Sequence, residues 1–153
     1  MTDIANITIS NDIIIPHFIE EMNNGHTVTF RPKGRSMRPF LEDGRDKVVL
    51  KKATEINIGD VVLAEVAKGT YVLHRVVNVT DGRVILRGDG NINTENCTLD
   101  DIHGTAVAFY RKGRRKPDYT TGMKWRIYSA LWTRLLPLRR YLLYAYRVTT
   151  NKH

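Results

Sequence analysis

Apolar residues recur along this chain in short runs that predict strands more often than helices. Beyond residue 45 the runs are rich in valine, isoleucine and leucine, and glycine-containing turns separate them. The runs occupy residues 46–52, 60–66, 70–79, 83–88 and 105–111. Short strands with close turns and no long helix between them indicate an antiparallel barrel or a coiled sheet. The pattern therefore predicts a mainly β fold.

The N-terminal part predicts one short helix and one strand. Residues 12–23 are typical of a helix, which we expect to begin near Pro16 because proline is tolerated in a first turn. The Asn-Asn-Gly sequence that follows is a stop signal, since both residue types accept the left-handed conformation. The next segment alternates between apolar and polar residues and predicts a strand that ends at Pro32.

The pattern changes twice after the first four of these runs. Residues 89–104 contain no such run, and we expect a long loop there, a feature that is often functional in a compact domain. Apolar residues at helical spacing return only near the C-terminus, where Pro137 should divide the helix into two. The predicted organisation is an N-terminal helical segment (1–25), a β domain (26–113), a polar linker (114–122) and an amphipathic helical tail (123–150).

Charge is distributed unevenly between the body and the tail. Residues 1–110 hold 12 Lys+Arg and 15 Asp+Glu, a net charge of −3, whereas residues 111–153 hold 12 Lys+Arg and one acid, a net charge of +11. A basic tail suggests an anionic partner, either a membrane surface or a nucleic acid. The N-terminal helical segment is too short for a helix-turn-helix module, so nucleic acid is the less favoured partner.

The tail combines amphipathic aromatic residues with interspersed arginines. The aromatic residues are Trp125, Tyr128, Trp132, Tyr141, Tyr144 and Tyr146, and the arginines are Arg126, Arg134, Arg139, Arg140 and Arg147. This composition is typical of a helix that lies on an anionic membrane, and five arginines argue against a spanning helix. The alternative is that the apolar stripe packs on the β domain or on a partner chain, which is the usual role of such a stripe.

The remaining composition bears on location and cofactors. Cys97 is the single cysteine, so neither an intrachain disulfide nor a thiolate metal cluster can form, which fits a reducing compartment. The start of the chain lacks the pattern of a signal peptide. We therefore expect a cytoplasmic protein, whose tail would allow peripheral attachment at the inner face of the membrane. The histidines lack metal-ligand spacing and no phosphate-binding glycine pattern occurs, so we expect neither a metal nor a nucleotide cofactor.

Four residues raise the question of nucleophilic chemistry. Ser36 lies in the sequence GRSMRPFL, and a serine hydroxyl becomes a nucleophile only when a neighbouring base removes its proton. His74 is such a base, in a strand where it should share its face with two valines. Asp89 and Glu95 follow, and an acid beside a histidine can hold its tautomer and stabilise the imidazolium. On its own, a histidine among apolar neighbours is more often structural.

Local motifs make the interpretation more specific. GRSMRPFL, GDVVLAEV, LHRVV, RGDGN and HGTAVAFYRKG occur in this order across residues 34–113. Together they resemble the signal-peptidase and SOS-repressor superfamily of serine peptidases. The resemblance implies a coiled antiparallel β-barrel, here with a short N-terminal helix and a C-terminal helical tail. It also implies a serine endopeptidase that cleaves a leader or precursor peptide; the alternative is a catalytically inactive or regulatory relative that binds peptide, membrane or DNA.

The resemblance also assigns roles. Leader peptidases and repressors of this superfamily use a lysine base, whereas the endoplasmic-reticulum and archaeal types use a histidine in an HRV-like motif, to which the HRV sequence at His74 is similar. Ser36 would be the nucleophile, and its backbone N–H would contribute to the oxyanion hole. Gly34 would permit close approach of the substrate or of the backbone, Met37 would pack beneath the cleft, and Pro39 would stiffen the turn.

The third member of the site stays open. In the histidine type, a Gly-Asp-Asn-Asn turn precedes a pair of aspartates, the second of which is the triad acid. Here the turn is Gly-Asp-Gly-Asn at residues 88–91, and counting onward without a gap puts Glu95 at the position of that acid. Triads with glutamate exist, so the sequence leaves the role between Glu95 and Asp89.

Overall fold

Nine strands form one sheet in the computed structural model, which describes residues 4–5, 11–32, 46–111, 115–120, 122–134 and 138–150. The strands are β1 (Ile4–Ala5), β2 (Val28–Phe30), β3 (Lys47–Lys52), β4 (Val61–Ala67), β5 (Thr70–Thr80), β6 (Arg83–Arg87), β7 (Glu95–Thr98), β8 (Ile102–Tyr110) and β9 (Asp118–Tyr119). The helices are α1 (Asn11–Asn23), α2 (Met123–Arg134) and α3 (Arg139–Thr150), with a short 3-10 turn, η1, at Leu99–Asp101.

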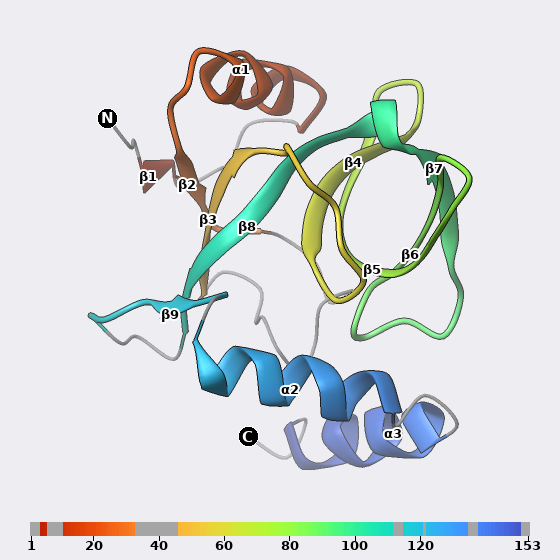
Figure 1. Ribbon diagram of the computed structural model, residues 1–153. Helices are drawn as coiled ribbons and strands as arrows, with labels where there is room; N and C mark the ends of the chain where they lie inside the picture. The colour runs from red at the N-terminus through yellow and green to blue at the C-terminus, as the bar shows by residue number, and fades with distance from the viewer. Residues whose placement is uncertain are drawn as a thin grey trace.

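The strands follow one another across the sheet in the order β1-β2-β3-β8-β4-β5-β6-β7, with β9 attached to β8. β1 pairs with β2 in parallel, and the other described pairs are antiparallel. The sheet curls into a half-barrel, with α1 at one end of the molecule and α2 and α3 at the other (Figure 1). The prediction of a mainly β, antiparallel fold with a helix before it and helices after it is confirmed at this level.

β4 is buried on both faces because it lies between two apolar clusters. Val61 and Leu63 belong to a first cluster, which α1, β2, β3 and β8 also line. Val62 and Ala64 point the other way, into a second cluster that is enclosed by the curled half of the sheet. A strand with water on one face alternates, whereas a strand that is covered on both faces reads as a continuous apolar run. The uninterrupted VVLA sequence therefore marks the centre of the fold.

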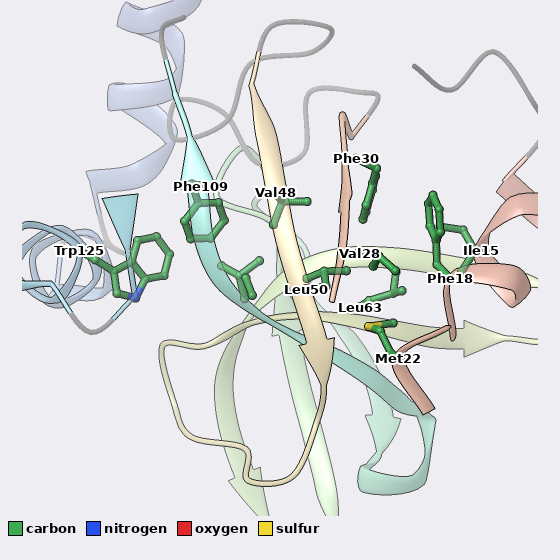
Figure 2. Packing of buried hydrophobic residues seen from close by; sticks show 12 residues of the cluster. Ile15, Phe18, Met22, Val28, Phe30, Val48, Leu50, Leu63, Phe109 and Trp125 are labelled. Carbon is green, nitrogen blue, oxygen red and sulfur yellow. The ribbon is translucent and has the colours of Figure 1, made fainter. Parts of the chain in front are cut away.

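Helix α1 covers the first cluster through one face. Ile15, Phe18 and Met22 recur at spacings of three and four residues and are buried, and Figure 2 shows them directed toward Val28 of β2. The helix begins at Asn11 and contains Pro16, so the predicted start near that proline is wrong. The predicted stop is confirmed.

The predicted loop at residues 89–104 is wrong over much of its length. β7 and η1 both lie within it, and β8 begins at Ile102. β7 contributes one buried side chain, Cys97, to the second cluster. Its sequence, ENCT, has no apolar alternation, so the strand forms because β6 offers it a free edge and not because its side chains form a pattern.

The tail is attached to the β domain through its first helix. Trp125 of α2 is 6% exposed and stacks on Phe109 of β8, with ring centroids 4.8 Å apart (Figure 2). Packing on the β domain, one of the two alternatives for the apolar stripe, is therefore what the inner face of α2 does. The division into two helices is confirmed, although Pro137 itself lies outside the described residues. β9 lies within the predicted linker and pairs with β8.

Candidate functional site

His74 lies on β5 with its side chain on the face of the second cluster. It pairs with Val62 of β4, and two neighbours at period two, Val72 and Val76, pack in the same cluster. The predicted face of His74 is thus confirmed. The residue is 4% exposed. A buried polar side chain is costly unless it is hydrogen-bonded, so its partners decide what it can do.

Glu95 is the acid that contacts this histidine. The Nδ1–H of His74 donates a hydrogen bond to Oε2 of Glu95 at 2.8 Å. The two residues meet because β6 separates β5 from β7 and Leu86 pairs with Val76 on one side and with Glu95 on the other. A carboxylate only accepts hydrogen bonds, so Nδ1 carries the proton of this contact, and in the neutral imidazole Nε2 would keep a lone pair for base chemistry. The glutamate side chain is 29% exposed, so the pair reaches solvent on the Glu95 side.

Asp89 has a different partner. Its side chain is fully buried and forms a two-fold ion pair with Arg75, in which Nε donates to Oδ1 at 2.8 Å and Nη2 donates to Oδ2 at 2.7 Å. The hydroxyl of Tyr128 donates to Oδ2 at 3.2 Å. Of the two acids that the sequence left open beside His74, Glu95 contacts the imidazole, whereas Asp89 ties the turn after β6 to β5 and α2.

Arg75 connects β5, the strand that bears His74, to helix α2. Its Nη1 donates to the carbonyl oxygen of Gly59 at 3.0 Å and to Oγ of Ser129 at 2.7 Å. The guanidinium lies 4.7 Å from the centroid of the Trp125 ring and 5.5 Å from that of Tyr128. A buried, planar guanidinium is stabilised by a bidentate carboxylate and by aromatic faces together, which this arrangement provides. The residue next to His74 is thereby held by a segment more than 50 positions away.

The ionisation behaviour of this buried group follows from its partners. Burial works against the charge of Arg75, but the carboxylate of Asp89 outweighs that effect and raises the pKa of Arg75 overall. Burial, with the nearby charge of Asp89, also raises the pKa of the Tyr128 phenol. The guanidinium therefore stays charged and the phenol stays neutral at physiological pH.

The proposed nucleophile and its neighbours belong to the segment between β2 and β3. Gly34, Ser36, Met37 and Pro39 all lie within residues 33–45, outside the described part of the chain. Their assignments stay predictions. The described flanks are β2, which ends at Phe30, and β3, which begins at Lys47.

Sequence reasoning singled out His74 and the two acids but missed the inner face of α2. Trp125, Tyr128 and Ser129 contact the Arg75–Asp89 pair, and nothing in their local sequence distinguishes them from the rest of the tail. A signal was present in the HRV motif, because an arginine inside a buried strand must find a carboxylate and further partners. Among the described residues, no group of three or more His, Cys, Asp or Glu side chains could hold a metal ion.

Comparison with known proteins adds no assignment. No protein-family model matches the chain, and no curated protein matches it significantly.

Proposed function

We propose that the protein is a serine endopeptidase of the signal-peptidase type, which cleaves a leader or precursor peptide. The observation that carries the proposal is the part-buried hydrogen bond from His74 to Glu95. His74 stands in the motif to which the resemblance assigns the base, and Glu95 is one of the two acids that the motifs left open as its orienting partner. A neutral histidine with a reference pKa of about 6.5 suits a base near neutrality better than a lysine, whose reference value is about 10.4.

The chemistry would proceed in two halves. Ser36 Oγ attacks the scissile carbonyl carbon while His74 Nε2 accepts the hydroxyl proton, and the Glu95 carboxylate stabilises the resulting imidazolium. The tetrahedral intermediate collapses with cleavage of the C–N bond, and the same proton passes from His74 to the departing amine. A water molecule then attacks the ester, again with His74 as base, which releases the carboxylic acid and restores the Ser36 hydroxyl.

The Arg75–Asp89 pair would support this site without touching the reacting atoms. The pair joins β5, which bears His74, to the turn that leads toward β7, which bears Glu95. A base and its orienting acid must be held within a few tenths of an ångström for catalysis, and buried bidentate contacts supply such rigidity. Asp89 is therefore a positioning residue in this proposal. The substrate would add as an extended strand, and the resemblance implies small residues just before the cut.

A serine-reactive fluorophosphonate probe tests the proposal, with the modified peptide identified by mass spectrometry. The full chain should be labelled on Ser36, and Ser36→Ala and His74→Ala should each abolish labelling. Ser10→Ala removes a serine outside the motifs and is the matched control. A folded wild-type protein that is not labelled, or is labelled elsewhere, would contradict the proposal and favour a regulatory relative without turnover.

The acids can be ranked in the same assay. Glu95→Gln removes the charge that faces His74, and loss of a triad acid's charge costs about 10⁴ in rate in the serine-protease template. Asp89→Asn should slow labelling less per folded molecule, because its carboxylate faces Arg75. The reverse ranking would transfer the role to Asp89, and equal, small effects would indicate a simple Ser–His dyad.

A further inference from the structure

Helix α2 presents an apolar stripe on the side opposite to its packed face. Met123, Ile127 and Leu131 are separated by four residues each and are 72%, 52% and 55% exposed. Residues at this spacing lie along one side of a helix. Trp125 and Tyr128 on the other side make the contacts with the body. The outer stripe is therefore not explained by the packing of α2 on the sheet.

Helix α3 repeats the arrangement. Tyr141, Tyr144 and Val148 follow the spacing of three and four residues and are 68%, 65% and 40% exposed, whereas Leu143 on the opposite side is buried. Both helices lie at the end of the molecule away from α1 (Figure 1). We call the six exposed residues of the two helices, Met123, Ile127, Leu131, Tyr141, Tyr144 and Val148, the tail stripe.

The concentration of exposed apolar side chains in the tail is unusual for a surface. Of the thirteen large hydrophobic residues that are exposed in the described part of the chain, eight lie between residues 123 and 148. Single exposed apolar residues are ordinary, but a group of them marks an interaction site. The other five are distributed over the rest of the described chain.

The charge around the stripe indicates which partner would cover it. Asp118 is the last acidic residue of the chain, while residues 123–150 contain six Lys+Arg. Arg126 and Arg147 are exposed on the same two helices. A nucleic-acid partner would satisfy only one half of this pattern, since phosphate backbones bind the basic residues and leave aliphatic side chains without a partner. An anionic lipid surface accepts both, with apolar and aromatic side chains among the headgroups and arginines at the phosphates.

We propose that the tail stripe docks the protein on an anionic phospholipid membrane. No helix among the described residues is long and apolar enough to cross a bilayer, and each of the two tail helices, at 12 residues, suits a position in the plane of the interface. Because the inner face of α2 is fastened to β8 and Arg75, the docked helix holds the β domain at one orientation above the lipid. The proposal is independent of the proposed peptidase activity, and Ser36→Ala protein serves equally well to test it.

The test is co-sedimentation of the full chain with vesicles of phosphatidylcholine, with and without phosphatidylglycerol. We expect binding to the anionic vesicles at low salt, little binding to the zwitterionic ones, and weakening as salt rises. The variant Ile127→Gln/Leu131→Gln/Tyr144→Gln keeps every charge and should bind at least about tenfold more weakly. Ile13→Gln/Ile92→Gln removes exposed apolar residues outside the tail and should bind like the wild type.

Several results would overturn the proposal. Absence of binding to anionic vesicles at low salt would contradict it. Undiminished binding by the triple variant would also contradict it, because the basic residues alone would then account for the binding. Steep salt-dependent binding of duplex DNA, without vesicle binding, would assign the tail to nucleic acid. A wild-type dimer that the triple variant converts to a monomer, without vesicle binding, would assign the stripe to a second copy of the chain. Circular dichroism of each variant checks that the fold is kept.

Discussion

Replacing Trp125 with alanine tests whether helix α2 belongs to the folded body. The indole is 6% exposed, stacks on Phe109 and lies against the Arg75 guanidinium. Removing a buried Phe or Trp side chain costs about 3–5 kcal/mol, which includes the transfer of its surface and the cavity left behind. The stacked ring and the cation–π contact contribute about 0.5–2 kcal/mol each, and they overlap with that total and do not add to it. We therefore expect a loss of about 3–5 kcal/mol.

The free energy of unfolding is measured by urea denaturation with circular dichroism as the signal. A small domain is stable by about 5–15 kcal/mol, so the expected loss is a large fraction and shifts the midpoint clearly. Ile127→Ala is the matched control, because Ile127 is 52% exposed on the outer side of the same helix. Surface substitutions away from special features change stability by about 0.5 kcal/mol or less.

The test depends on the difference in the free energy of unfolding between Trp125→Ala and Ile127→Ala. If Trp125→Ala costs less than about 1 kcal/mol, or no more than Ile127→Ala, the inner face of α2 is not packed on the β domain. Trp125→Phe keeps an aromatic ring over Arg75 and should retain part of the stability. That variant gives an intermediate value in the event that the alanine variant does not fold.

Three further predictions concern buried groups. Asp89→Asn leaves the Arg75 charge buried without its counter-ion and should lower the free energy of unfolding, measured by urea denaturation, by about 3–5 kcal/mol. The double variant Arg75→Met/Asp89→Leu should restore much of that loss, and a loss near zero in Asp89→Asn would show that the pair is solvated. Burial raises the pKa of Tyr128, so the unfolded phenol loses its proton first above about pH 10, and stability falls there by up to about 1.4 kcal/mol per pH unit. Tyr128→Phe should flatten this slope between about pH 10 and 11, and parallel slopes would contradict the assignment. Burial also raises the pKa of the Cys97 thiol, so a disulfide reagent should modify the native protein at least about tenfold more slowly than the urea-unfolded chain, and equal rates would count against its burial.

Local patterning predicted the elements well where side chains of one kind repeat. The apolar runs became β3, β4, β5, β6 and β8, and the Asn-Asn-Gly stop ended α1, where Gly25 has a φ of +90°. The prediction failed at β7, whose four residues bury a single side chain. A strand that forms by pairing with an open edge carries little signal of its own, because its stability comes from the neighbour.

The sequence predicted which residues belong to the candidate site but not which of them are in contact. The motifs singled out His74 and two acids, and they left open which acid faces the imidazole. In the structure Glu95 reaches His74 from 21 residues away, because the register of β6 with its two neighbours brings them together. Register depends on which face of each strand is buried, and that is a property of the whole sheet.

The sequence by itself determined the strand runs, the split tail, the uneven charge and the motifs that contain the chemically capable residues. Each of these depends on residues that are near one another in the chain, where periodicity, turn chemistry and composition act directly. Only the tertiary structure decided that Glu95 contacts His74, that Asp89 is neutralised by Arg75, and that α2 covers this pair with one face and leaves the tail stripe exposed on the other. The physical reason is that a buried charge must be matched by partners wherever the fold supplies them, and here they come from segments 14 and 54 residues away.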